Sequence, residues 1–118
     1  MASPNLTAQP YDEWTLLERT VKVETAAEIV AKKLWHRGDR ATARDLFDLS
    51  LVVEREPEAL ATAAPYLVRH RDAFLTQIER RRTVLGAQFE AIDALSYRPT
   101  YDEAVERASR FLNRLPAV

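Results

Sequence analysis

After residue 24, the apolar positions recur at the three- and four-residue spacings of amphipathic α-helices. One such pattern covers residues 25–38, which open with Thr25-Ala-Ala-Glu28 and close at Gly38. The opening has the form of a capping box, and glycine can take the left-handed conformation that ends a helix. A second pattern covers roughly residues 42–56. The tight turn between the two predicts a helical hairpin.

The second half of the chain continues the helical pattern, with proline and polar breaks. Pro57 and Pro65 bracket a short helix, because proline is tolerated in a first turn but not in a helix interior. A long apolar stripe then predicts one helix reaching about residue 95, within which Gly86 could mark a bend. Its members are Leu67, Phe74, Leu75, Ile78, Leu85, Phe89 and Ile92. Thr100-Tyr-Asp-Glu103 is a second capping box and opens a last helix.

The N-terminal residues have a different character. Residues 1–12 carry two prolines and no period, as in an extended lead-in. Residues 13–23 are rich in β-favouring side chains interrupted at 18–19, which predicts a short hairpin. We therefore predict a mainly α fold of four to five helices with a small N-terminal β-hairpin. Residues 1–24 form the lead-in and hairpin, and residues 25–118 form the helical domain.

Composition narrows the class of protein. A chain of 118 residues with 47% hydrophobic and 30% charged residues suits one soluble domain. The net charge of −1 means that any attraction to nucleic acid must come from a local basic face. The absence of cysteine excludes disulfides and thiolate sites, and the two histidines have no metal-site spacing. Without an export signal or a membrane-length apolar run, we expect a cytoplasmic protein that has no membrane partner.

One charged cluster joins the first two predicted helices. Arg44, Asp45 and Asp48 crowd one side of the second helix, and Lys33 lies near the end of the first. Two carboxylates on one face repel each other, so a lysine, a cation or a ligand should relieve the repulsion. Lys33 should therefore reach Asp45 or Asp48 across the hairpin, in a surface cleft. From spacing alone, salt bridges that tie the hairpin together explain the cluster, and a binding site is the alternative.

These stretches also carry a family resemblance. Glu28-Ile-Val-Ala-Lys-Lys33-Leu, followed by Arg44-Asp45-Leu-Phe-Asp48-Leu, resembles the C-terminal helical part of the nucleotidyltransferase toxins of the AbiEii/AbiGii family, over residues 21 to about 112. The resemblance implies nucleotide transfer from a nucleoside triphosphate, with Mg²⁺, to an acceptor such as tRNA, and an antitoxin partner. It also implies that Lys33 and Arg44 bind substrate and that Asp45 or Asp48 acts in catalysis.

The sequence departs from that family in one respect. Polymerase-type transferases hold their metal ions with a Gly-Ser turn and an Asp-x-Asp pair, and this sequence contains neither. We therefore expect no protein ligands for a metal and no transfer activity from this chain alone, whether it is a fragment or a truncated gene product. The alternative is a non-catalytic helical module that binds RNA or a protein partner.

The predicted hairpin also suggests self-association. Trp14, Leu16, Val21 and Val23 would expose an apolar patch and an unpaired strand edge, which a homodimer would cover. The alternative is that residues 1–23 fold back over the helices.

Overall fold

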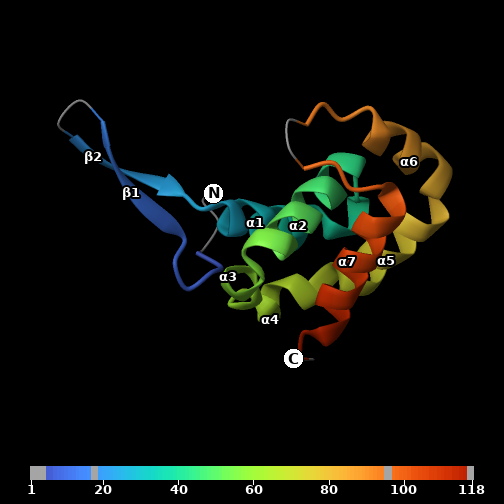
Figure 1. Ribbon diagram of the computed structural model, residues 1–118. Coiled ribbons are helices and arrows are strands. Elements are labelled where there is room, and N and C mark those ends of the chain that lie inside the picture. Colours follow the sequence, from blue (N-terminus) through green and yellow to red (C-terminus); the bar gives the residue numbers. More distant parts are fainter. Residues whose placement is uncertain (1–4, 17–18, 95–96, 117–118) are drawn as a thin grey trace.

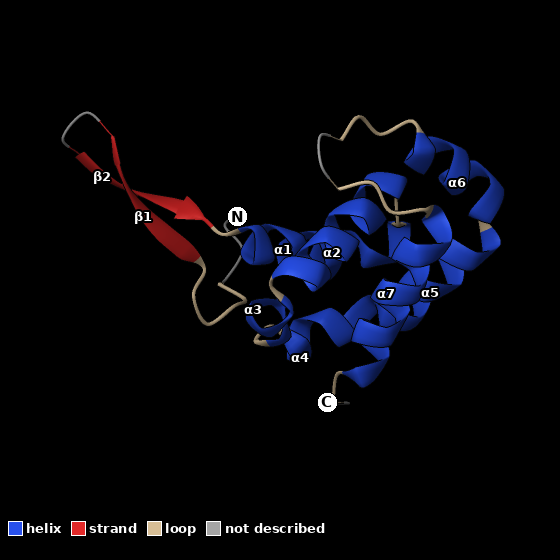
Figure 2. Ribbon diagram, viewed as in Figure 1, coloured by secondary structure: helices blue, strands red, loops and turns tan. Residues whose placement is uncertain are grey.

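The computed structural model describes residues 5–16, 19–94 and 97–116, and it confirms the mainly α fold class (Figure 2). Two strands are followed by helices that pack into one body (Figure 1). The elements are β1 (Tyr11–Leu16), β2 (Arg19–Glu24), α1 (Ala26–Arg37), the 3₁₀ turn η1 (Gly38–Arg40), α2 (Ala43–Arg55), α3 (Pro57–Ala61), α4 (Ala64–Leu67), the 3₁₀ turn η2 (Val68–His70), α5 (Arg71–Arg80), α6 (Arg82–Glu90) and α7 (Tyr101–Arg114). In the described residues, no helix is both long and apolar enough to cross a bilayer.

The core is built around α2, which packs against α1 on one side and against α6 and α7 on the other. Leu46 and Leu49 on α2 have no exposed surface. Aromatic rings extend this core toward α6 and α7: the Phe47 and Phe89 centroids lie 5.7 Å apart, and those of Phe89 and Tyr101 lie 5.6 Å apart. The predicted apolar stripes of α2 and α7 therefore face each other in the centre of the molecule.

The single long helix predicted up to residue 95 is wrong, because the structure divides it. A short helix, α4, and the turn η2 precede α5, and α5 ends where Arg81 leaves the helical conformation, with ψ of 24°. Gly86, where we expected a bend, lies inside α6. The break at Arg81 still keeps Ile78 and Leu85 fully buried, and the Tyr101 hydroxyl donates to the Ile78 carbonyl over 2.7 Å. Packing of α7 thus secures the junction.

The two strands pair with each other in antiparallel register, from Tyr11 opposite Glu24 to Leu16 opposite Arg19. They extend away from the helices, and β2 leads directly into α1 (Figure 1). The predicted apolar patch on Trp14, Leu16, Val21 and Val23 falls on side chains outside the described part of the structure.

The two predicted capping boxes differ in the structure. At α7, the Thr100 hydroxyl accepts from the Glu103 backbone and the Glu103 carboxylate accepts from the Thr100 N–H. This backbone hydrogen bond lowers the pKa of the Glu103 carboxyl below its usual value. At α1, the Thr25 hydroxyl accepts from the Glu28 N–H, as in a capping box. The Glu28 carboxylate, however, does not accept from the Thr25 N–H, which donates to the Pro10 carbonyl instead. The prediction of a reciprocal box at α1 is therefore wrong.

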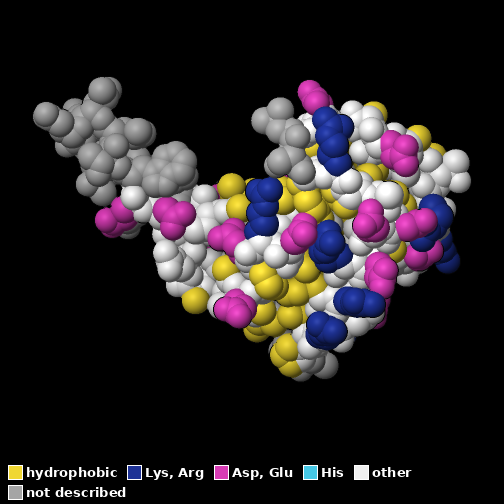
Figure 3. All heavy atoms as spheres, viewed as in Figure 1, with side chains coloured by type: hydrophobic (Ala, Val, Ile, Leu, Met, Phe, Trp, Pro, Cys, Tyr) yellow, Lys and Arg dark blue, Asp and Glu magenta, His cyan; other side chains and the backbone are white. Residues whose placement is uncertain are grey.

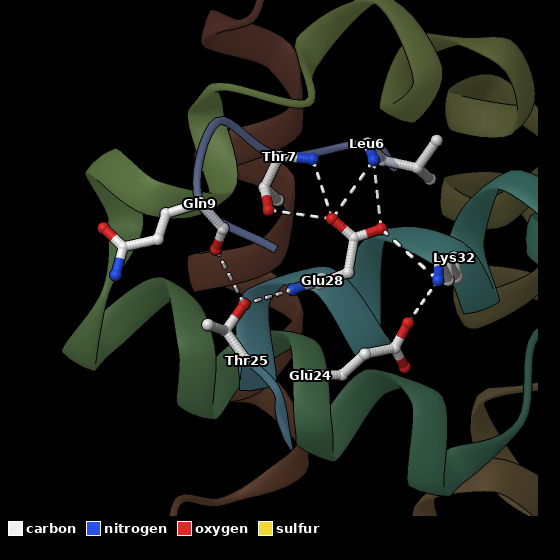
Figure 4. Close-up of polar contacts among 7 residues, drawn as sticks. All are labelled: Leu6, Thr7, Gln9, Glu24, Thr25, Glu28 and Lys32. Atoms are coloured by element: carbon white, nitrogen blue, oxygen red, sulfur yellow. Dashed lines mark hydrogen bonds and ion pairs between the residues drawn. The ribbon is translucent and has the colours of Figure 1, made fainter. Parts of the chain in front are cut away.

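Glu28 instead holds the N-terminal segment against the helices (Figure 4). Its side chain is fully buried, and its two oxygens accept from the Leu6 N–H at 3.0 and 3.1 Å. The N–H and the hydroxyl of Thr7 each donate to Oε1 over 2.8 Å. Lys32 lies 3.8 Å from Oε2 and also pairs with Glu24, whose hydrogen bond raises the pKa of the Lys32 ammonium. Several donors thus satisfy one buried carboxylate.

The hydrogen bonds to Glu28 hold residues 5–10 of the N-terminal segment against the helices. Leu6 is only 3% exposed and belongs to the core, and the Ala8 N–H donates to the Thr62 hydroxyl over 2.9 Å. The described residues 5–10 therefore fold back over the helices, while β1 and β2 do not.

The buried carboxylate of Glu28 should contribute strongly to the stability of the fold. Replacing Glu28 with Ala leaves the donors of Leu6 and Thr7 buried and unpaired, so we expect a loss of about 3 kcal/mol in the free energy of unfolding. Urea denaturation followed by circular dichroism measures it. Glu90→Ala, which removes an exposed carboxylate at the end of α6, is the control and should change stability by less than about 0.5 kcal/mol. Equal effects of the two substitutions would contradict the role given to Glu28.

Candidate functional site

The helical pair α1 and α2 places the four predicted site residues on one side of the molecule. Lys33 lies in the second half of α1, and Arg44, Asp45 and Asp48 lie in the first half of α2. Thr42 caps α2, because its hydroxyl accepts from the Asp45 N–H over 3.1 Å. The caps and the short η1 turn therefore fix how the charged ends of the two helices meet.

The turn between these helices depends on Gly38, although not in the way the sequence suggested. Gly38 has a φ of −60°, so it does not adopt the left-handed conformation that we expected. A Cβ atom at this position would lie 2.7 Å from the His70 Cβ. The glycine is needed because η2 approaches the end of α1 closely.

Asp48 is the point at which cations from both helices converge. The Lys33 Nζ lies 3.2 Å from Oδ2, and the Arg44 Nε lies 3.1 Å from Oδ1. The Arg44 guanidinium also stands over the Phe47 ring, 5.4 Å from its centroid. The predicted contact of Lys33 with an aspartate across the hairpin is confirmed for Asp48.

Asp45 makes a separate pair with Arg37, a residue that our sequence reasoning missed. The Arg37 Nη2 donates to Asp45 Oδ1 over 2.8 Å, and the Asp45 side chain is only 4% exposed. Arg37 follows Lys33 by four residues and therefore shares its face of α1. That spacing was the signal that could have identified it. Two parallel ion pairs, Lys33 with Asp48 and Arg37 with Asp45, connect α1 to α2.

The two hollows that the described structure contains beside α2 lie away from this cluster, so the surface cleft that we expected around Lys33 stays a prediction. A groove of about 420 Å³ is lined by residues from the end of α2, the start of α3 and α7, and a hollow of about 70 Å³ lies between α2, α6 and the following loop. Neither is lined by Lys33, Arg44, Asp45 or Asp48. The cations of the cluster face solvent, because the Lys33, Arg37 and Arg44 side chains are 32%, 45% and 60% exposed, whereas Asp45 is buried beneath them.

The charges of the cluster favour an anionic ligand over a metal ion. Three cations, Lys33, Arg37 and Arg44, face two carboxylates, so the cluster has one excess positive charge. Both Asp48 oxygens and one Asp45 oxygen already contact cations. Among the residues that the structure describes, no group of three or more acidic or histidine side chains could hold a metal. The two carboxylates of this cluster therefore do not offer free oxygen ligands for the Mg²⁺ that the resemblance implies.

The comparison with known families agrees with the motif in these two helices. The chain belongs to the family described as "Nucleotidyl transferase AbiEii toxin, Type IV TA system", whose model matches residues 2–115. The match covers more of the chain than the motif residues suggested, and membership implies an antitoxin partner. No curated protein and no solved structure matches the chain.

The two aspartates should differ in their effect on stability. Asp45→Ala removes a buried carboxylate that pairs with Arg37 and also favours the N-terminus of α2, so we expect a loss of about 2 kcal/mol in unfolding free energy. Asp48→Ala removes a more exposed partner and should cost less than about 1 kcal/mol. Urea denaturation tests the order, with Asp93→Ala in the exposed loop as the control. A larger loss for Asp48→Ala would contradict the assignment of Asp45 as the structural residue.

Proposed function

We propose that α1 and α2 form the nucleotide-facing surface of a nucleotidyl transferase toxin, with Lys33 and Arg44 as ligands for the triphosphate. The observation that supports this most is the convergence of these two cations, from separate helices, on the single carboxylate of Asp48. Family membership supplies the substrate class. We infer a cytoplasmic site of action, where nucleoside triphosphates are available.

In this proposal, Asp48 orients the cations until the triphosphate binds. The Lys33 and Arg44 side chains are 32% and 60% exposed, so an anionic ligand can reach both. A polyphosphate offers more negative charge than one carboxylate and would compete for the two cations. Asp48 would then be free to accept a hydrogen bond or a proton from the acceptor hydroxyl.

Asp45 has a different part in this proposal. Its carboxylate is buried and paired with Arg37, so it holds α2 against α1 and positions the neighbouring Arg44. Of the two aspartates that the motif suggested as catalytic, Asp48 is the one whose exposure suits contact with substrate. Asp45 acts as a positioning residue.

We further propose that the chain corresponds to the C-terminal helical part of such an enzyme and does not transfer nucleotides alone. The sequence has no Gly-Ser pair and no Asp-x-Asp pair. Metal ions neutralise much of the charge that develops in phosphoryl transfer, so a chain without the two motifs that hold them should not transfer nucleotides. A tRNA acceptor is part of this proposal and comes from the family resemblance.

Binding of a nucleoside triphosphate tests the assigned surface. Lys33→Ala and Arg44→Ala should each weaken the binding of GTP or ATP about tenfold, because each removes one cation from the phosphates. Isothermal titration calorimetry with the full chain gives the dissociation constants. Arg55→Ala is the matched control, since it removes an exposed cation from the last turn of α2. Equal affinity in all four proteins would contradict the proposed surface.

Transfer itself is a separate measurement. The chain, incubated with labelled nucleoside triphosphates, magnesium and bulk tRNA, should leave the tRNA unlabelled. Label that accumulates in proportion to protein, and disappears with Asp48→Asn, would show that this chain is active alone and would overturn the proposal of inactivity.

A further inference from the structure

The side chain of Gln77, on α5, spans the turn that joins α1 to α2. Its Oε1 accepts from the Ala41 N–H over 2.6 Å, and its Nε2 donates to the Asp39 carbonyl. Asp39 lies within η1, and Ala41 follows the last residue of η1. One side-chain amide therefore uses both its acceptor and its donor on the backbone of the same turn. We call these two hydrogen bonds the Gln77 clamp.

The clamp holds a part of the backbone that is closed to solvent. Ala41 is only 1% exposed, so water cannot replace the Gln77 oxygen as the acceptor for its N–H. Elsewhere on the turn, a Cβ atom at Gly38 would lie 2.7 Å from the His70 Cβ, because η2 comes so close. Both α5 and η2 pack against η1. The turn is therefore fixed by elements outside the pair of helices that it connects.

The clamped turn joins the charged ends of α1 and α2. Arg37 ends α1 just before the turn, and Thr42 follows the turn as the N-cap of α2. The Thr42 hydroxyl accepts from the Asp45 N–H, and the Asp45 carboxylate accepts from Arg37 over 2.8 Å. An ion pair and a helix cap thus flank the turn that Gln77 holds. A shift of the turn would change how the two helices present their charged side chains.

Fixed spacing of the cations matters because the chain as a whole does not attract anions. Its net charge is −1, and Figure 3 shows basic and acidic side chains interspersed over the helical body. Affinity for an anion must then come from cations that are already held close together. Lys33 and Arg44 belong to the two helices that the turn connects. Their spacing therefore depends on the turn as well as on the core.

We propose that Gln77 is a positioning residue for the charged cluster: the Gln77 clamp fixes η1 and thereby the spacing at which Lys33 and Arg44 bind a triphosphate. The role toward a ligand rests on the proposed function, whereas the clamp itself is a contact within the chain. A purely structural role for Gln77 is the alternative. Its loss would then lower stability but leave the affinity of the folded protein unchanged.

Two substitutions of Gln77 test the proposal on the full chain. Gln77→Met keeps the length of the side chain and removes both hydrogen bonds, and Gln77→Asn keeps an amide that is one methylene too short to span the turn. Both should weaken ATP binding about fivefold in isothermal titration calorimetry, at a temperature where circular dichroism shows each protein to be folded. The same two substitutions at Gln88, an exposed glutamine of α6, are the controls and should leave the affinity unchanged.

Amide hydrogen exchange, followed by NMR on the ¹⁵N-labelled chain, measures the clamp without a ligand. Exchange at Ala41 should become about tenfold faster in both Gln77 variants, because its N–H loses its acceptor. The amide of Leu49, in the core of α2, is the internal reference and should change less, since a general loss of stability would speed both amides together.

Each way in which the proposal can fail has its own result. Equal exchange at Ala41 in the Gln77 and Gln88 variants would show that no clamp exists. Faster exchange with unchanged ATP affinity would make Gln77 purely structural and overturn the positioning role. Wild-type protein that binds no ATP, or binds it as well after Lys33→Ala, would overturn the proposed function and with it the role of Gln77 toward a ligand.

Discussion

The burial of Glu28 is the constraint on which much of the N-terminal half depends. A carboxylate with no solvent contact is costly unless donors and a countercharge surround it; here Leu6 and Thr7 donate hydrogen bonds and the Lys32 ammonium lies 3.8 Å away. The segment 5–10 cannot leave α1 without exposing both this charge and the buried Leu6. The start of α1 is therefore held both by its Thr25 cap and by the segment 5–10. This fixes the position of the whole helix, including the residues near its other end that form ion pairs with α2.

Helix α1 therefore has two roles: it anchors the N-terminal segment, and it carries residues of the candidate site. Glu28 at the start of α1 secures the lead-in, while Lys33 and Arg37 further along α1 face the carboxylates of α2. An ion pair at a surface contributes little to stability when its partners can move. Here the backbone of both helices is held by the core and by caps, so the cations stay close together. A ligand that binds them would find the site already formed.

The sequence was sufficient for the mainly α fold class and for one contact of the site, because both follow from local spacing, but not for the predicted four to five helices, since the described residues form α1 to α7. Apolar periodicity located α1, α2 and α7, and the spacing predicted that Lys33 would pair with Asp45 or Asp48, of which Asp48 is the partner in the structure. The break at Arg81 could not be predicted, since it depends on how α7 packs against the junction of α5 and α6. Spacing also could not show that η2 comes close to Gly38.

Glu28 is the clearest case of a residue whose local pattern was misleading. Its position three residues after Thr25 fits a capping box, yet a distant segment of the chain offers its carboxylate more donors. Tertiary contacts also give the two aspartates different surroundings, because the pairing of Asp45 with Arg37 requires the helices to be in place. The donors that Leu6 and Thr7 offer to Glu28 are not encoded in the spacing of residues along one helix.

The central claim is that the α1 and α2 surface receives the triphosphate. Titration of the ¹⁵N-labelled full chain with a non-hydrolysable nucleoside triphosphate, followed by amide chemical shifts, tests it most directly. The account predicts shifts confined to the end of α1, the η1 turn and the first half of α2. Shifts centred on α7, or no shifts at millimolar nucleotide, would contradict it.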